Sequence, residues 1–252
     1  MNERFAIKVH AGVRLLVYRP WWDEGILHGM TLSDLDFKGE TMASSERVLC
    51  AALGVTDLAV PQQVHGDRSC DLRSAQSIES LASEKGKLFK SVECDALIAP
   101  THQMIPARRV AFGVMAADCV PVLVRARTGW AAIHAGWRGL ACGVIAKTLA
   151  SLDGLIEAAV FAAAGGERYE VGREVVDAIG ASAVFRKTAD EKYLLDTAAT
   201  AIKQLAECSG SLRAESAQIC TISDQRFHSF RRQGEACGRS VAFVVPVVCL
   251  SS

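Results

Sequence analysis

A short apolar run that stops at a glycine-rich turn constrains this chain more than any other feature. Residues 130–133 (Trp-Ala-Ala-Ile) are apolar and short, as a buried strand is. Residues 139–152 carry Ala, Leu and Ile at helical spacing. Residues 134–139 (His-Ala-Gly-Trp-Arg-Gly) are therefore expected on a strand-to-helix turn. Such a turn places side chains at the end of a sheet, beside the unpaired backbone N–H groups of a helix start.

Two side chains on this turn can take part in chemistry. His134 can act as a metal ligand or as a base at the end of the strand. Arg138 adds a planar set of donors beside the helix start, which suits an oxyanion such as phosphate. The simpler interpretation is a tight turn with glycines for geometry and an arginine in solvent. The turn taken alone favours that simpler interpretation, so other segments must decide.

Elsewhere the apolar pattern predicts interleaved strands and helices. Strands are expected at residues 5–20 (a hairpin), 58–64 (near a sheet edge because it contains Pro61), 94–99, 110–116, 120–124, 156–163, 218–222 and 240–248. Helices are expected at residues 44–53 (stopped by Gly54), 139–152, 171–179 and 197–207, and residues 71–90 are expected to form an exposed connection. The elements do not alternate regularly, which indicates an α/β or α+β fold with a mixed, largely buried sheet. No repeat or linker divides the chain, so we expect a single domain over residues 1–252.

Composition narrows the class of protein. Half of the 252 residues are hydrophobic, and 28 basic residues balance 28 acidic ones, which argues against a general surface for nucleic acid or anionic membrane. No apolar run reaches the ~18 residues that cross a bilayer, and the N-terminal residues lack a signal-peptide pattern. A cytoplasmic protein is expected. The nine cysteines include no Cys-x-x-Cys pair, which argues against a zinc ribbon or a thioredoxin-type site.

Three residues able to bind metal or act as nucleophile or base each follow a predicted strand: His65, Cys119 and His134. Two imidazoles and one thiolate suit a catalytic zinc ion, which keeps one position for water or substrate. A thiolate is too soft a ligand for calcium or magnesium. Each residue taken singly is more often structural, and their spacing cannot prove that they meet. Asp118 and Gln63 could orient these ligands, although turn capping is an equally good explanation for Gln63.

Four segments, in the same order, resemble the signature blocks of the YfiH-like family, also called the multicopper polyphenol oxidase or laccase-domain family. They are residues 63–66 (Gln-Val-His-Gly), 94–98 (Cys-Asp-Ala-Leu-Ile), 117–123 (Ala-Asp-Cys-Val-Pro-Val-Leu) and 134–139. Later segments agree, at residues 169–172, 193–196, 220–224, 226–232 and 238–239. The resemblance covers nearly the whole chain, and the four central blocks are specific when taken together.

The resemblance implies a single-domain fold of four layers, α–β–β–α, and a zinc site at His65, Cys119 and His134. It also implies phosphorolysis of purine nucleosides, including methylthioadenosine, together with adenosine deamination. Zinc would then polarise a water for deamination, while Arg138 and the following amides from Gly139 onward would hold phosphate. The laccase label implies copper, but several coppers need about ten ligands, largely histidine, and this chain has six histidines. We therefore expect zinc, a purine nucleoside and phosphate as partners.

Two departures from the family pattern keep other functions open. The family usually has a Ser/Thr-Arg pair shortly after the His-Gly near residue 28, and no arginine stands at residues 30–34 here. It also usually has Gly-Pro-x-Ile before Tyr169, where this chain reads Ala-Ala-Ala-Gly-Gly-Glu at 162–167. One alternative is a cysteine hydrolase or deamidase with Cys119 as nucleophile and a histidine as its base. Another is a peptidoglycan-editing factor or polyphenol-oxidase-like protein with weakened nucleoside activity.

Overall fold

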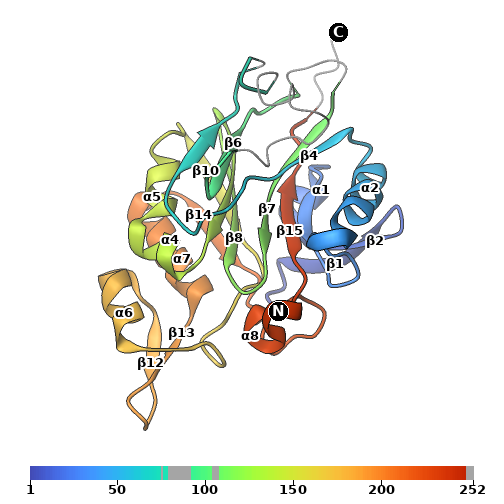
Figure 1. Ribbon diagram of the computed structural model, residues 1–252. Helices are drawn as coiled ribbons and strands as arrows, with labels where there is room; N and C mark the ends of the chain where they lie inside the picture. Colours follow the sequence, from blue (N-terminus) through green and yellow to red (C-terminus); the bar gives the residue numbers. More distant parts are fainter. Residues whose placement is uncertain (75, 79–91, 104–107, 248–252) are drawn as a thin grey trace.

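Two six-stranded sheets stack face to face in the computed structural model, which describes residues 1–74, 76–78, 92–103 and 108–247 (Figure 1). Across sheet 1 the order is β1 (Phe5–His10), β2 (Val13–Tyr18), β3 (His28–Thr31), β15 (Ser240–Val244), β7 (Val110–Ala116) and β4 (Asp57–Ala59). Across sheet 2 it is β14 (Arg213–Ser216), β10 (Leu155–Val160), β8 (Val120–Ala126), β9 (Gly129–Ala135), β6 (Ala96–Ala99) and β5 (Ser69–Asp71). A small third sheet contains β11 (Glu170–Val171), β13 (Tyr193–Leu195) and β12 (Phe185–Lys187). Parallel and antiparallel pairs both occur, so the predicted mixed sheet is confirmed.

Helices cover the outer faces of the two sheets. The described helices are α1 (Arg19–Asp23), α2 (Met42–Leu53), α4 (Trp137–Cys142), α5 (Val144–Leu149), α6 (Arg173–Ile179), α7 (Thr197–Cys208) and α8 (Phe230–Gln233), with single 3₁₀ turns at Gly39–Thr41, Gly180–Ser182 and Gly234–Ala236. In Figure 1, α2 lies beyond sheet 1, and α4, α5 and α7 lie beyond sheet 2. No described helix has the length and apolar character needed to cross a membrane.

Three hydrophobic cores separate the four layers. The core between the sheets contains side chains such as Met30 of sheet 1 and Leu123 of sheet 2. On β8 the neighbours Val122 and Val124 point the other way, into the core under the helices. A strand buried on both faces has no polar side to show, which is why the central strands are continuously apolar in the sequence. These layers match the four-layer α–β–β–α arrangement that the resemblance implies.

Two sequence predictions were wrong at glycine or strained positions. The helix predicted over residues 139–152 is two helices, because Gly143 has a left-handed backbone (φ 77°) that ends α4 before α5 starts. The segment 218–222 is not a full strand but makes one isolated bridge, from Cys220 to Ala163: the strand is β14, which ends at Ser216, and Gln218 has φ 52°. A non-glycine residue in that region interrupts a strand, and turns follow it.

Other predicted boundaries shift while the element stays. The strand predicted at 58–64 is the short β4, which forms an edge of sheet 1 as the proline suggested, and the chain then crosses to sheet 2. The helix predicted from residue 171 begins two residues later, after β11. The sequence pattern did not reveal the small third sheet or β5. Most of the exposed connection predicted at 71–90 lies outside the described residues.

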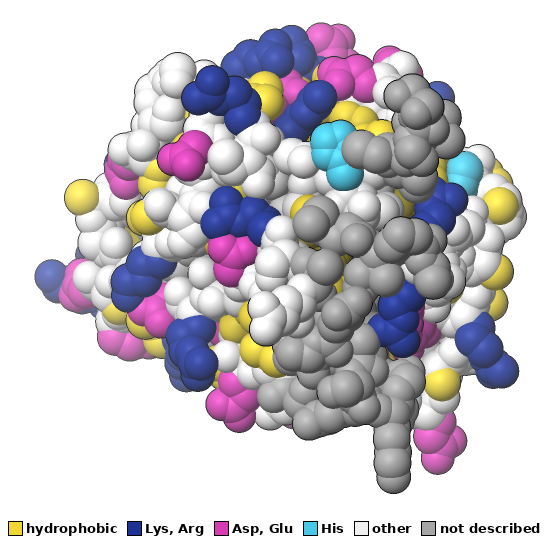
Figure 2. Space-filling model, turned by 90° about the horizontal axis from the view of Figure 1, so that it is seen from above, with side chains coloured by type: hydrophobic (Ala, Val, Ile, Leu, Met, Phe, Trp, Pro, Cys, Tyr) yellow, Lys and Arg dark blue, Asp and Glu magenta, His cyan; other side chains and the backbone are white. Residues whose placement is uncertain are grey.

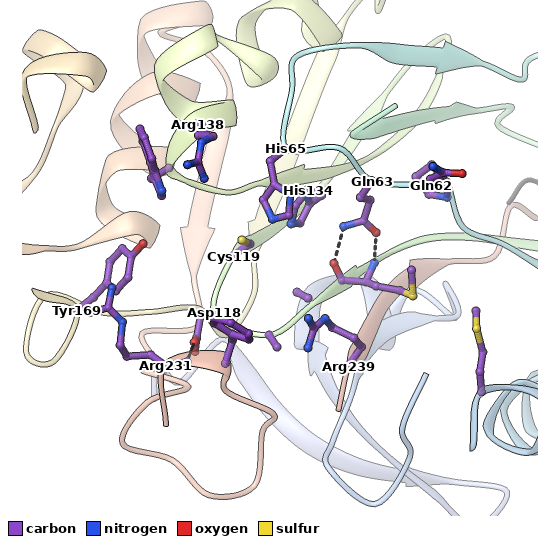
Figure 3. A pocket seen from close by; sticks show the side chains of 17 residues that line it. Gln62, Gln63, His65, Asp118, Cys119, His134, Arg138, Tyr169, Arg231 and Arg239 are labelled. Carbon is purple, nitrogen blue, oxygen red and sulfur yellow. Dashed lines mark hydrogen bonds between the residues drawn. The ribbon is translucent and has the colours of Figure 1, made fainter. Parts of the chain in front are cut away.

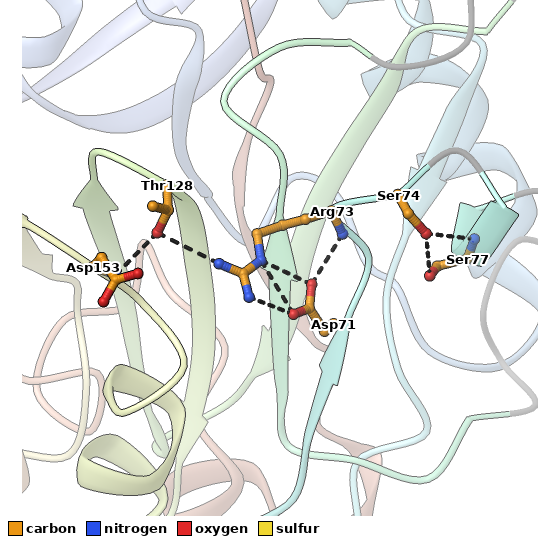
Figure 4. Close-up of polar contacts among 6 residues, drawn as sticks. All are labelled: Asp71, Arg73, Ser74, Ser77, Thr128 and Asp153. Atoms are coloured by element: carbon orange, nitrogen blue, oxygen red, sulfur yellow. Dashed lines mark hydrogen bonds and ion pairs between the residues drawn. The ribbon is translucent and has the colours of Figure 1, made fainter.

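The edge strand β5 is tied to the rest of sheet 2 by side chains (Figure 4). The guanidinium of Arg73 donates to Asp71 through Nη2 at 2.6 Å and reaches Thr128 Oγ1 at 3.4 Å through Nη1. The same Thr128 hydroxyl accepts the backbone N–H of Asp153 at 2.9 Å. The network joins β5 to the turn between β8 and β9 and to the chain after α5.

Charged side chains of both signs are interspersed on the face seen in Figure 2. Among the described residues there, Lys and Arg lie next to Asp and Glu. The described side chains on this face thus carry charges of both signs, as the balanced composition of the chain does.

Candidate metal centre

Three chain segments bring His65, Cys119 and His134 together where the two sheets meet. His65 lies on the stretch that crosses from β4 in sheet 1 to β5 in sheet 2. Cys119 lies on the bend that joins β7 of sheet 1 to β8 of sheet 2, and His134 lies near the end of β9. One ligand atom from each residue falls within 4.8 Å of the others. Their convergence, which sequence spacing could not prove, is therefore a property of the fold.

The donor set and its setting fit a zinc ion. Two imidazole nitrogens and one thiolate sulfur are borderline-soft donors that zinc accepts, and calcium or magnesium does not favour them. His134 is buried, Cys119 is half-buried and His65 is exposed. The cluster is therefore enclosed by protein on the side of His134 and open to solvent on the side of His65. That open side faces a cavity of about 920 Å³, which leaves a position for substrate. Among the described residues this is the one group of three or more His, Cys, Asp or Glu side chains that could hold a metal ion.

The cluster favours the deprotonated thiol that metal binding requires. Burial alone would raise the pKa of Cys119, but the charge of His134 and hydrogen bonds from His134 and His65 outweigh it and lower this pKa to about 6. Burial would lower the pKa of His134, whereas the Cys119 thiolate and Asp95 raise it to about 9. A thiolate is therefore available near neutral pH, for a metal or as a nucleophile.

Asp95 completes the cluster, and sequence reasoning gave it no role. It immediately precedes β6 and is fully buried. Its Oδ1 accepts a hydrogen bond from His134 Nδ1 at 2.9 Å, which leaves His134 Nε2 for the metal side. Burial alone would raise the pKa of Asp95, but hydrogen bonds from His134 and from the amides of Gly66 and His65 hold that pKa below its ordinary value. The Cys-Asp-Ala-Leu-Ile block at 94–98 was the sequence signal that could have pointed to Asp95. Local sequence, however, does not show which residues lie across a sheet.

Gln63 and Asp118 fix segments beside the cluster. The Gln63 side chain donates to the Met115 carbonyl and accepts from the Met115 amide, both at 2.7 Å (Figure 3). It thus continues the pairing of β7 after β4 has ended. Asp118 Oδ1 accepts from the Thr221 hydroxyl and Oδ2 from the backbone amide of Arg231, each at 2.6 Å. Both residues hold backbone in place, and among the described residues neither donates to nor accepts from a histidine ring of the cluster.

Gly136 is required for close packing against the cluster. A Cβ atom there would lie 2.9 Å from Cys119 Sγ and 3.2 Å from His65 Cδ2. Gly139, predicted to help bind phosphate, is buried, and a Cβ there would meet the Gly66 carbonyl at 3.2 Å. Gly139 is not among the residues that line the cavity, so its place in the structure is one of helix-to-loop packing.

Aromatic rings and guanidinium groups form the cavity walls (Figure 3). Arg138 stacks over the Trp137 ring, with its Cζ 4.4 Å from the ring centroid, and has no carboxylate partner among the described residues. Arg231 stacks over Tyr169 at 4.9 Å. Arg239 lies on the opposite side of the cluster from Arg138 in Figure 3. The segments that depart from the family pattern, 30–34 and 162–167, do not line this cavity.

Comparison with known proteins places these features in context. Residues 30–246 match the family model described as multi-copper polyphenol oxidoreductase laccase. A purine nucleoside phosphorylase of Aquifex aeolicus is 38% identical over 132 residues, or 50% of this chain and 61% of that protein, so less than two thirds of it is spanned. A purine nucleoside phosphorylase of Mycobacterium bovis is 30% identical over 218 residues, or 81% of this chain and 78% of that protein. The crystal structure of YlmD from Geobacillus stearothermophilus has the same fold, with a TM-score of 0.79, 20% identity, and coverage of 98% of this chain and 100% of that one.

Proposed function

The chain belongs to the multi-copper polyphenol oxidoreductase laccase family, and from that premise we propose that it is a zinc-dependent purine nucleoside phosphorylase. We include methylthioadenosine phosphorolysis and adenosine deamination in the proposal. The observation that carries it is the convergence of His65, Cys119 and His134 beside a cavity that also contains an arginine without a carboxylate partner. The names of the relatives support phosphorolysis, and the two-nitrogen, one-sulfur donor set supports zinc.

The cavity walls suit a nucleoside and an oxyanion. Its volume of about 920 Å³ is within the range of small-molecule sites. The rings of Trp137 and Tyr169 offer flat apolar surfaces against which a purine can stack. Arg138 offers its planar donors to phosphate, because no described carboxylate competes for them. Base, sugar and phosphate can thus lie along the cavity wall beside the cluster.

In phosphorolysis a phosphate oxygen bonds to the anomeric carbon of the sugar as the bond from that carbon to the purine nitrogen breaks. The sugar carries positive charge in the transition state, so an anion held by Arg138 stabilises it. The departing purine takes up at its nitrogen the proton that the hydrogen phosphate ion gives up. Zinc, when bound, would supply Lewis acidity that makes water a better nucleophile for deamination. In both reactions Asp95 keeps the proton of His134 on Nδ1.

The test is metal analysis of purified protein together with an adenosine assay. Ribose 1-phosphate release should require phosphate, ammonia release should not, and chelation should abolish both. Inosine, which has no 6-amino group, should give a phosphate-dependent product without ammonia, and methylthioadenosine should give a phosphate-dependent product. Stoichiometric zinc with no turnover of any purine nucleoside would reject the proposed activity and leave the metal site.

One observation favours a second candidate, a cysteine hydrolase or deamidase. Cys119, His134 and Asp95 stand in the order of a nucleophile, a base and a group that orients the base. Zinc and this chemistry compete, since a metal-bound thiolate is a poor nucleophile. Stoichiometric alkylation of Cys119 by iodoacetamide in zinc-replete protein would favour the hydrolase. Protection that disappears with a chelator would favour the zinc enzyme.

A further inference from the structure

We infer that Asp95 is a positioning residue that sets the placement of both imidazoles of the metal centre, His65 as well as His134. The inference rests on the metal centre of the proposed function. Asp95 is fully buried in the layer between the segment that carries His65 and the strand that carries His134. In this role Asp95 does not bind the metal itself. Its carboxylate acts through the two histidines.

Both oxygens of the Asp95 carboxylate are occupied by groups of the cluster. Oδ1 accepts from His134 Nδ1 at 2.9 Å and from the backbone amide of His65 at 2.9 Å. Oδ2 accepts from the amide of Gly66 at 2.7 Å and from that of Val64 at 3.3 Å. Three successive backbone amides and one ring nitrogen therefore converge on one side chain. Charge-assisted hydrogen bonds of this kind are the strong ones.

The loop around His65 needs such an anchor. His65 has φ 59°, a left-handed backbone that a non-glycine residue keeps only when its surroundings impose it. On the sheet 1 side the loop is held through Gln63 and Met115. On the sheet 2 side it is held by Asp95. The ring of His65 meets the ring of His134 edge-to-face, with centroids 4.9 Å apart, and the anchored backbone sets the direction from which it does so.

Asp95→Asn replaces one carboxylate oxygen by an NH2 group, and the resulting amide can take two orientations. Each orientation disturbs the contacts of a different oxygen. In Asp95→Asn the amide nitrogen cannot accept from Gly66 and Val64, so one orientation releases the His65 loop. The flipped orientation turns the amide donors toward His134 Nδ1, which must then give up its proton. The proton moves to Nε2, the nitrogen on the metal side, and blocks it. Either orientation impairs at least one of the two histidines, because Oδ1 also accepts the amide of His65, whereas a purely structural carboxylate would affect stability alone.

Glu157→Gln provides the matched control. Glu157 on β10 is also a buried, hydrogen-bonded carboxylate of sheet 2, accepting from Tyr18 Oη at 2.9 Å and from Trp21 Nε1 at 2.6 Å. It stands opposite Arg125 on β8, which is about 20 Å along the strand from Cys119. Both variants lose one buried charge and should lower the melting temperature, but only one lies at the cluster.

The experiment measures zinc affinity by chelator competition in wild type, Asp95→Asn and Glu157→Gln, each well below its melting temperature. We expect Asp95→Asn to bind zinc roughly 10–100-fold more weakly and Glu157→Gln to bind as wild type does. Amide hydrogen exchange of a peptide covering residues 62–68 should also accelerate in Asp95→Asn alone. The thiolate absorption band of the cobalt-substituted protein should weaken in parallel.

Each alternative outcome separates this inference from the proposed activity. Wild-type zinc affinity in Asp95→Asn, with only a lower melting temperature, would overturn the positioning role. Weaker zinc binding without faster exchange at 62–68 would restrict Asp95 to His134 and overturn its hold on His65. If wild type binds zinc and turns over no nucleoside, the activity fails while the role of Asp95 is still measured. A wild type that binds no metal would overturn both.

Discussion

Cys119 supplies the only sulfur atom of the cluster, and that atom can be exchanged with little change in shape. Serine is nearly isosteric, but its hydroxyl is not ionised near pH 7 and binds zinc poorly. We expect Cys119→Ser to lose bound zinc and any nucleoside activity, with a modest shift in melting temperature. Metal analysis and calorimetry on the same preparation check this. Full zinc retention would show that Cys119 is an ordinary core thiol.

Arg138 allows the two proposed activities to be separated. Arg138→Lys keeps the charge but loses the planar two-point grip on phosphate. A lost charge-assisted contact is worth about 1.5–3 kcal/mol, or roughly tenfold to over a hundredfold in rate. Phosphorolysis should fall by that factor, and deamination should be nearly unchanged because it needs no phosphate. Release of ribose 1-phosphate and of ammonia are measured on one variant.

A structural role for Arg138 gives a different result. If the side chain only stabilised its turn, both activities and the melting temperature would fall together in Arg138→Lys. Arg138 has no carboxylate partner among the described residues, so a structural role would have to act through its stacking on Trp137. Parallel loss of both activities would nevertheless reject the phosphate role.

At the level of single residues, the sequence pattern singled out three candidates and the resemblance implied that they meet, but neither indicated what organises them. His65, Cys119 and His134 could be chosen because each is a metal-binding residue type at the end of an apolar run. Asp95 could not be assigned a role, because its partners come from a loop and a strand that only the sheet pairing brings beside it. Hydrogen bonds that join distant segments leave no periodic signal in a sequence.

At the scale of elements, the turn between β9 and α4 has no room for a side chain at Gly136. Its backbone (φ −70°, ψ 171°) is one that alanine adopts readily, so conformation does not require glycine there. A Cβ atom would instead press on Cys119 and His65. We expect Gly136→Ala to weaken zinc binding strongly while the free energy of unfolding of the metal-free protein changes little. Chelator competition and urea unfolding measure the two quantities.

Gly143 is the matched control on the same stretch. It has φ 77° and nothing within 4 Å of a Cβ position, so Gly143→Ala meets backbone strain without a collision. The strain should lower stability by roughly 1–2 kcal/mol and leave zinc affinity unchanged. If Gly136→Ala and Gly143→Ala lowered zinc affinity alike, the effect would belong to helix stability and not to the cluster.

Apolar periodicity found the elements that are buried on both faces and failed where backbone conformation decides. The strands at β7, β8 and β9 were found because continuous apolar runs of that length fit a sheet covered on both sides. The segment at 218–222 (Gln-Ile-Cys-Thr-Ile) also has residues typical of a strand, yet with Gln218 left-handed it makes a single isolated bridge, from Cys220 to Ala163. The break at Gly143 was missed because a glycine within a helical pattern is also compatible with one continuous helix.

At the scale of the whole molecule, stacking two sheets creates the site. Two connections cross between the sheets near the cluster, one carrying His65 and one carrying Cys119, while His134 belongs to sheet 2 itself. Local pattern predicted the class of fold and its mixed sheet, since both follow from the interleaving of elements. It could not predict which strands would be neighbours, because β15 pairs with β3 and β7 across more than a hundred residues of sequence.

The pH dependence of the free energy of unfolding should reveal the burial of His28, which lies in β3 of sheet 1. His28 Nε2 accepts from the Tyr18 amide at 3.0 Å and Nδ1 lies 2.8 Å from the Ile26 carbonyl, so the neutral ring is the form that fits. Burial lowers the pKa of His28 to about 4, against 6.5 in the unfolded chain. Between these values the unfolded state binds more protons, so stability falls as pH falls from about 6.5 to about 4.

The size of that loss follows from the pKa difference and reaches about 3 kcal/mol at the lower limit. His28→Gln keeps one acceptor and one donor but does not titrate, so its stability should depend less on pH in this window. Urea unfolding of wild type and variant at pH 7, 5.5 and 4.5 gives the difference, in which the carboxylates common to both proteins cancel. The gap between the two stability curves should change in favour of the variant as pH falls. Parallel curves would mean that folded His28 takes up its proton at an ordinary pKa, either through water entering between β2 and β3 or through local opening of that end of sheet 1.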